Sequence, residues 1–114
     1  MEPIQRTVIY YETTEGKEPY KEWFEELCDE RARAKIRVRI RRASLGNFGH
    51  CRILGDGVSE LKVDYGPGYR VYFGVAGNKL IVLLCGGDKR TQTEDIEQAK
   101  FLWKCYRSRS DGKK

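Results

Sequence analysis

The amino-acid sequence predicts an α+β domain in which a small antiparallel sheet packs against a helical hairpin and a further helix follows. Three observations lead to this prediction: helical spacing of apolar residues early in the chain, strand-like patterns after residue 52, and a second helical pattern near the end. A length of 114 residues suits one domain with a single core. We assign this domain to residues 1–106 and expect the polar segment 107–114 to be a disordered tail.

The first elements are a strand and a helix. Residues 4–12 mix β-branched and aromatic side chains, which is typical of a strand. A polar turn around Gly16 ends this strand, and Pro19 suits the first turn of a helix because its missing N–H costs nothing there. The helix is predicted from four apolar residues that share one helical face, namely Tyr20, Trp23, Phe24 and Leu27.

The next segment, residues 30–45, carries two competing patterns. Its apolar residues alternate with seven cations between Arg31 and Arg42, which is a strand period. The same segment also has a helical apolar stripe and is rich in Ala and Arg, which favour helices. Asp29 can cap such a helix, and Gly46 can end it. We therefore predict a second helix over this segment.

Three strands and a last helix complete the domain. Residues 58–65 alternate between apolar and polar side chains, and a Gly-Pro-Gly turn at 66–68 leads to a second strand over 69–75. A turn at 76–79 precedes the apolar run 80–85, which is typical of a buried central strand. The final helix begins near residue 93 and carries an apolar face formed by Ile96, Ala99, Leu102 and Trp103.

Composition narrows the classes of function. The formal net charge is +5 and the pI is about 9.1, which favours a polyanionic partner without identifying it. The longest apolar run, residues 80–85, is too short to span a membrane, and the N-terminus lacks the pattern of a signal peptide. We therefore expect a cytoplasmic protein that makes no membrane contact.

The cysteines indicate neither a metal site nor a disulfide framework. The four cysteines, at positions 28, 51, 85 and 105, have no CxxC spacing, and His50 is the single histidine. We interpret the cysteines as reduced, small apolar residues and expect the protein to need no metal and no cofactor.

A cluster of cations is the strongest candidate for chemistry. Lys62 and Arg70 lie on the two arms of the predicted hairpin, and Lys89, Arg90 and Gln92 follow the last strand. Because adjacent strands lie about 5 Å apart, these side chains can share one surface. Such a surface suits phosphodiester chemistry on RNA, because the 2′-hydroxyl is a built-in nucleophile and cations stabilise the charge that develops on phosphorus without a metal.

Each of these residues also has a purely structural interpretation. Arg70 can equally form a structural salt bridge, and Lys89 and Arg90 can be ordinary loop charges. His50, in a glycine-containing loop, is more often a surface residue than an acid or base. The cations of residues 31–42 can follow a phosphate backbone, form a solvated helix face or receive an acidic partner. The residues by themselves thus indicate a basic α+β domain that contacts RNA or an acidic protein.

Several motifs resemble those of a known toxin family. These are SELK at 59–62, GPGYRVYF at 66–73 and LLCGGDK at 83–89, followed by Gln92. In order and spacing they resemble the HigB-like branch of the RelE/ParE toxins, also called addiction module killer proteins. The resemblance covers about residues 7–104, and it implies a RelE-like order of strand, two helices, three-strand meander and helix.

The resemblance implies a toxin of a type II toxin–antitoxin module, most often an endonuclease that cleaves mRNA on the ribosome and leaves a 2′,3′-cyclic phosphate. The implied partners are an antitoxin with a DNA-binding motif encoded by the adjacent gene, mRNA on the ribosome, and operator DNA through the antitoxin. Two alternatives remain open: a ParE-like toxin that inhibits DNA gyrase without chemistry, and a decayed toxin that only binds its antitoxin.

The resemblance also implies which residues form the site, because positions of this sequence can be matched to those of RelE-type enzymes. Arg70 matches the arginine that contacts the scissile phosphate in RelE-type enzymes, Lys62 matches a strand lysine of that site, and Lys89 lies in the basic segment after the last strand. Two positions depart from the family pattern: Ile96 stands near a usual acid or base, and Glu60 replaces a second lysine. Proton transfer is therefore left to Tyr72, Tyr106 or His50, or to Lys62 acting as a base beside Arg70. The expected RNA contacts are Arg90, Gln92, Tyr72 and Arg52.

Overall fold

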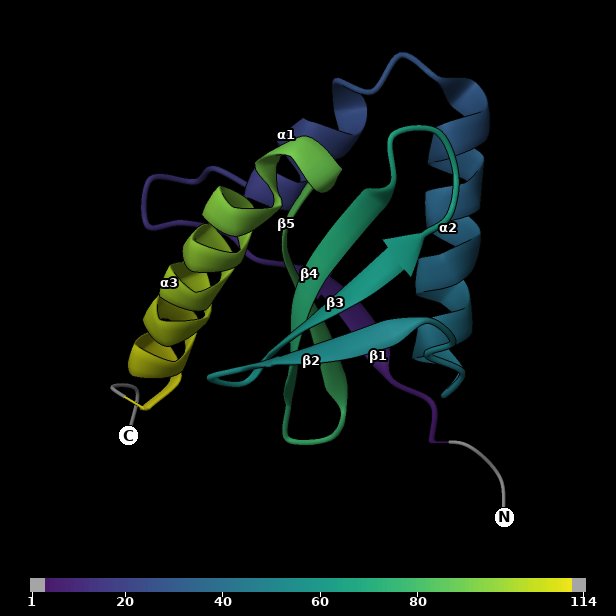
Figure 1. Ribbon diagram of the computed structural model, residues 1–114. Helices are drawn as coiled ribbons and strands as arrows, with labels where there is room; N and C mark the ends of the chain where they lie inside the picture. Colours follow the sequence, from purple (N-terminus) through teal and green to yellow (C-terminus); the bar gives the residue numbers. More distant parts are fainter. Residues whose placement is uncertain (1–3, 112–114) are drawn as a thin grey trace.

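A computed structural model describes residues 4–111, which form a five-stranded sheet with helices on both faces (Figure 1). The α+β class predicted from the sequence is confirmed. The elements in chain order are β1 (Thr7–Tyr10), α1 (Pro19–Glu25), α2 (Glu30–Ser44), β2 (Cys51–Gly55), β3 (Val58–Val63), β4 (Tyr69–Ala76), β5 (Leu80–Gly87), the short 3₁₀ helix η1 (Lys89–Thr91) and α3 (Gln92–Asp111).

The sheet is mixed rather than wholly antiparallel. Its strand order is β1-β5-β4-β3-β2, and the neighbours from β2 to β5 run antiparallel. β1 instead runs parallel to β5, with Thr7 opposite Leu80, so the expectation of an antiparallel sheet is wrong at this edge. Parallel pairing requires a long crossover, which is possible because two helices and three strands lie between β1 and β5 in the chain.

β2 is a strand that the sequence prediction omits, so the meander has four strands instead of three. It forms the edge of the sheet, and its pairing with β3 is irregular between Ile53 and Gly55. The side chain of Ile53 is 84% exposed. An edge strand that buries little surface lacks the apolar alternation from which strands are predicted, which explains the omission.

α2 is a helix, as predicted, because its termini and its apolar stripe both support helical structure. The Asp29 carboxylate accepts hydrogen bonds from the backbone N–H groups of Arg31 (2.9 Å) and Ala32 (3.1 Å), which caps the N-terminus. Ala32, Ile36 and Ala43 are buried against the sheet. Cations and apolar residues alternate here as in a strand, but the segment forms a helix because the helix buries its apolar stripe on one face.

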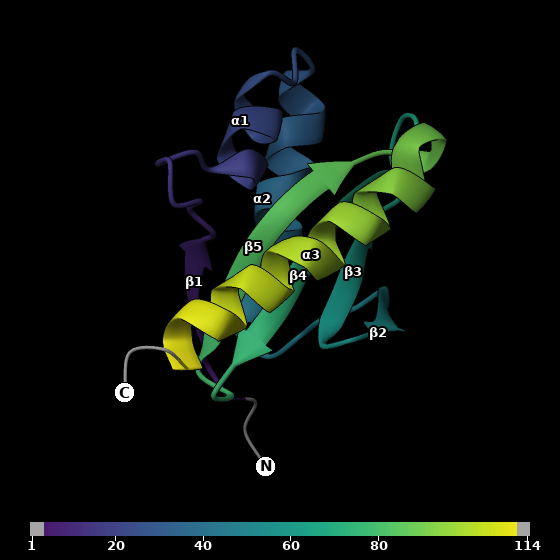
Figure 2. The same cartoon turned by 90° about the vertical axis from the view of Figure 1, so that its left-hand side faces the viewer.

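Each face of the sheet has its own core (Figure 2). α1 and α2 cover one face, and α3 runs diagonally across the other. On the α3 face, Trp103 lies directly against the backbone of β4, because a Cβ added at Gly74 would lie 2.5 Å from its ring. Because side chains alternate along β3 and β4, they are divided between the two cores. The site residues predicted on these two strands lie on the α3 face.

α3 continues past residue 106, where the sequence suggested that the folded domain ends. It reaches Asp111, and residues 112–114 of the expected tail lie outside the described part of the chain. Arg109 anchors the last turns: its Nη2 donates to the Glu12 carbonyl at 2.8 Å, and its guanidinium lies 5.0 Å from the centre of the Tyr11 ring. Neither α3 nor any other helix within residues 4–111 is long and apolar enough to cross a membrane.

Candidate functional site

The β3–β4 hairpin brings the predicted cations together on the α3 face of the sheet. In its register Lys62 pairs with Arg70 and Glu60 pairs with Tyr72, while Arg52 of β2 pairs with Glu60. Side chains of residues two apart on a strand point to the same face, so these residues form two adjacent cross-strand rows. The predicted pairing of Lys62 and Arg70 across the hairpin is confirmed.

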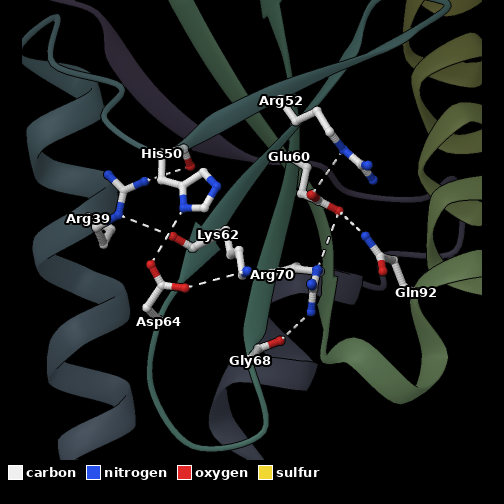
Figure 3. A network of polar contacts seen from close by, with 9 residues as sticks. All are labelled: Arg39, His50, Arg52, Glu60, Lys62, Asp64, Gly68, Arg70 and Gln92. Atoms are coloured by element: carbon white, nitrogen blue, oxygen red, sulfur yellow. Dashed lines mark hydrogen bonds and ion pairs between the residues drawn. The ribbon is translucent and has the colours of Figure 1, made fainter.

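Glu60 lies at the centre of a polar network (Figure 3). Its Oε1 is 3.6 Å from Arg70 Nε and accepts a hydrogen bond from Gln92 Nε2 at 2.9 Å, while its Oε2 is 3.5 Å from Arg52 Nε. The side chains of Glu60 and Arg70 are almost fully buried, whereas that of Arg52 is 58% exposed. We call Arg52, Glu60, Arg70 and Gln92 the Glu60 cluster. Two guanidinium groups around one carboxylate leave this cluster with a net positive charge.

The guanidinium of Arg70 is held on a second side by the turn of the hairpin. Its Nη1 donates to the Gly68 carbonyl at 2.7 Å. Gly68 has a φ of +82°, and a Cβ there would lie 3.3 Å from Arg70 Nη1 and 3.9 Å from Lys89 Cβ. Gly68 therefore lies between Arg70 and Lys89, so the turn and η1 bring these two cations to the same end of the sheet.

Lys62 links the Glu60 cluster to a second group of polar side chains. Its Nζ lies 3.6 Å from Asp64 Oδ1, and Asp64 Oδ2 lies 3.5 Å from His50 Nδ1. The hydrogen bond from His50, supported by the charge of Lys62, holds the pKa of Asp64 below its ordinary value. His50 is thus adjacent to a carboxylate near the site, although its side chain is 58% exposed.

The predicted RNA contacts are not equally accessible. Tyr72 is fully buried, so its side chain offers no surface to RNA, and this prediction is at odds with the structure. Burial, with the nearby carboxylates of Glu60 and Asp95, raises the pKa of the Tyr72 hydroxyl, which disfavours a role as a base. Gln92 is bound to Glu60 and therefore holds that carboxylate in place.

The two cations of η1 are exposed but differ in their partners. Arg90 Nη2 forms an ion pair with Asp88 Oδ2 at 3.0 Å, and its side-chain hydrogen bond to Asp88 lowers the pKa of that carboxyl. Lys89 has no ion-pair partner within residues 4–111. Lys89, next to Gly68 and Arg70, is therefore the more available of the two charges.

Tyr106 does not belong to this site. Its ring stacks on Trp103 with 5.3 Å between the centroids, and Trp103 covers Gly74, four residues along β4 from Arg70. Four residues of a strand span about 13 Å. Of the tyrosine and histidine candidates for proton transfer, only His50 is both near Lys62, the remaining candidate, and exposed.

Sequence reasoning missed the contributions of Arg39 and Asp64. Arg39 of α2 donates to the backbone carbonyls of His50 (3.0 Å) and Lys62 (3.4 Å), and Asp64 bridges Lys62 and His50. Arg39 stands in a run of seven cations, and none of the sequence patterns distinguishes it from its neighbours. In the part of the chain that the structure describes, there is no cluster of three or more metal-binding side chains.

The chain is similar to a family described as phage-derived protein Gp49-like (DUF891), whose profile matches residues 22–104. It is also similar to a protein of Haemophilus influenzae (strain ATCC 51907 / DSM 11121 / KW20 / Rd), which bears the name "uncharacterized protein". The two sequences are 49% identical over 83 residues, covering 73% of this chain and 84% of that protein. The matched region contains the hairpin, the Glu60 cluster and η1. The chain therefore belongs to the Gp49-like family, which is associated with toxin–antitoxin modules of the RelE/HigB type.

Proposed function

We propose that this protein is the toxin of a type II toxin–antitoxin module and cleaves mRNA on the ribosome without a metal. The association of its family with such modules supports the first part and implies an antitoxin as a partner. One observation carries the second part: Arg70, Lys62 and Lys89 converge at one end of the sheet, on the α3 face. We further propose that the antitoxin carries a DNA-binding motif and brings the toxin to operator DNA.

The proposed reaction is an attack by the 2′-hydroxyl of the RNA on the adjacent phosphate. A bond forms between the 2′-oxygen and phosphorus, the bond to the 5′-oxygen breaks, and the products are a 2′,3′-cyclic phosphate and a 5′-hydroxyl. The 2′-hydroxyl loses a proton and the leaving 5′-oxygen gains one. Arg70, Lys62 and Lys89 stabilise the negative charge that grows on the phosphoryl oxygens.

In this proposal Glu60 positions Arg70. The guanidinium is held at Nε by Glu60 and at Nη1 by Gly68, which defines the orientation of its plane. Preorganised donors lower a reaction barrier because they need no reorientation when charge develops. Arg52 and Gln92 hold Glu60 in turn. Glu60, which stands where the family pattern has a second lysine, thus helps to position Arg70.

The test is induction of the wild type and of variants in a bacterial host, with primer extension on an abundant mRNA. We expect new 5′ ends within translated codons for the wild type and their loss in Arg70→Ala. Arg107→Ala serves as the control because it removes one exposed arginine from α3, away from the site. Cleavage that persists at the wild-type rate in Arg70→Ala would contradict the proposal.

A second variant guards against a folding defect, because Arg70 is buried and its loss leaves Glu60 without that partner. Lys62 is only partly buried, so Lys62→Ala is expected to keep the fold and still lower cleavage about 100-fold or more. Circular dichroism of both purified variants distinguishes lost chemistry from lost structure.

One observation supports a second candidate function. Arg70 is buried and paired with Glu60, as a structural arginine would be. In that case the protein acts by binding alone, either as a ParE-like inhibitor of DNA gyrase or as a decayed toxin that binds only its antitoxin. Growth arrest with DNA damage and intact mRNA supports the gyrase target, and normal growth on induction supports the decayed toxin.

A further inference from the structure

A groove of about 400 Å³ lies between α2 and the end of β3, beside the candidate site. Its polar lining comes from Lys35, Arg39, Arg42, His50, Lys62 and Asp64, and we call it the α2 groove. Figure 3 shows Arg39, His50, Lys62 and Asp64 converging from α2, from the loop before β2, and from the end of β3 and the residue that follows it.

Arg39 holds the wall of the groove in place. Its hydrogen bonds to the His50 and Lys62 carbonyls tie the loop before β2 and the strand β3 to α2. Gly49 approaches the same guanidinium, because a Cβ at Gly49 would lie 3.0 Å from Arg39 Nη1. The groove is therefore formed by contacts between three segments that are distant in the chain.

The charge of the groove is strongly positive and largely uncompensated. Four cations line it, and its single carboxylate, Asp64, already contacts Lys62 and His50. Lys35 and Arg42 form no ion pair with any acid within residues 4–111. The ammonium of Lys35 lies 5.4 Å from the centre of the Tyr65 ring, which leaves its charge available.

Lys62 joins the groove to the candidate site. It lines the α2 groove, and its neighbour across the hairpin is Arg70. A single strand of nucleic acid whose phosphate reaches Arg70 can therefore place a neighbouring phosphate in the groove. Neighbouring cations that can contact successive phosphates are the arrangement that binds single strands through their backbone.

We propose that the α2 groove is a second phosphate-binding subsite, which holds the RNA strand next to the phosphate at Arg70. This inference rests on the proposed function, whose substrate is RNA. An acidic protein segment is the other polyanion that could bind here, and Val38, which lines the groove and is 46% exposed, offers it an apolar contact. RNA is favoured because Lys62 lines the groove and also pairs across the hairpin with Arg70, so one strand can reach both places.

The test measures RNA binding separately from cleavage. The probe is a fluorescent 12-nucleotide RNA with 2′-O-methyl groups throughout, which cannot undergo attack by the 2′-oxygen. The variant is Lys35→Ala/Arg42→Ala, which removes two exposed cations. It leaves intact the hydrogen bonds from Arg39 to the His50 and Lys62 carbonyls. The matched control is Lys104→Ala/Arg107→Ala, which removes the same two charges from exposed positions on α3.

We expect the groove variant to raise the Kd for this RNA about tenfold at low salt, as the loss of charge-assisted contacts predicts. We also expect it to reduce the slope of log Kd against log salt concentration by about 1.4, since each phosphate contact on a single strand contributes about 0.7. The control should change the Kd less than about twofold, because its charges lie on another surface.

Three outcomes would overturn the proposal: no RNA binding by the wild type, equal weakening in the groove variant and the control, or unchanged RNA binding in the groove variant. An acidic peptide of 12 glutamates identifies the rival occupant. If the groove variant loses this peptide but keeps RNA, the groove receives a protein partner instead. Because the probe cannot be cleaved, a failure of mRNA cleavage in cells rejects the proposed function without affecting this result.

Discussion

The carboxylate of Glu60 shows how a single buried residue can organise a site. It contacts Arg70, Arg52 and Gln92, which come from β4, β2 and the start of α3. Residues from three elements are thus connected through one side chain that is 4% exposed. Buried charges of this kind require partners, because an unpaired charge in a poorly solvated interior is costly.

We predict that Glu60→Ala destabilises the protein by about 3–5 kcal/mol, because it leaves the buried guanidinium of Arg70 without its acidic partner. The free energy of unfolding in urea measures this change. Asp64→Ala is the control: Asp64 also forms an ion pair, but its side chain is 69% exposed, so solvent screens the pair and the loss should be much smaller. Equal losses for the two variants would show that Arg70 does not depend on Glu60.

At the level of elements, α2 illustrates a competition between two patterns in the same residues. Its cations and apolar residues alternate as in a strand, but the segment is a helix with Ala32, Ile36 and Ala43 buried. The cap supplied by Asp29 at one end and the helical stripe together favour the helix over the strand. As a helix, the segment can bury its stripe and still expose the cations that line the α2 groove.

We predict that Asp29→Ala lowers the free energy of unfolding by about 1 kcal/mol, because two backbone N–H groups of the first turn lose their acceptor. Urea unfolding followed by circular dichroism at 222 nm measures the loss. Glu97→Ala, which removes an exposed acid from α3 where no cap is involved, should change stability by less than about 0.5 kcal/mol. A neutral Asp29→Ala variant would mean that burial alone determines the start of α2.

For the whole molecule, the two-sided packing of the sheet determines where the site can form. α1 and α2 occupy one face, so the polar rows of β2, β3 and β4 are left to the face that α3 covers only in part. α3 is held close to the sheet by Trp103, whose ring lies against Gly74 of β4. The position of Gln92, at the start of α3, depends on this packing.

We predict that Gly74→Ala destabilises the protein by about 2 kcal/mol, because the new methyl group overlaps the ring of Trp103. A double-mutant cycle with Trp103→Leu tests the cause, since the smaller side chain leaves room for the methyl group. The cost of Gly74→Ala should be markedly smaller in the Trp103→Leu background. Additive free energies of unfolding would exclude Trp103 as the source of the strain.

Much of the fold was predictable from patterns that are local in the chain. The helical stripes, the cap at Asp29 and the turn at 66–68 each involve residues that are close in sequence, so three helices and the β3–β4 hairpin could be identified. The hairpin register also brought Lys62 and Arg70 together. The motifs around this hairpin likewise resemble the toxin family with which the Gp49-like family is associated.

Other features were decided only by tertiary structure, because they depend on contacts between distant residues. β2 pairs at an edge with little burial, β1 joins β5 in parallel across most of the chain, and α3 continues to Asp111, with Arg109 anchored on Tyr11 and Glu12. The burial of Arg70 against Glu60 and the hydrogen bond from Arg39 to the His50 carbonyl also depend on tertiary contacts. Local spacing therefore determined which residues could meet across a hairpin, whereas long-range packing decided which charges are paired, buried or left free to bind a phosphate.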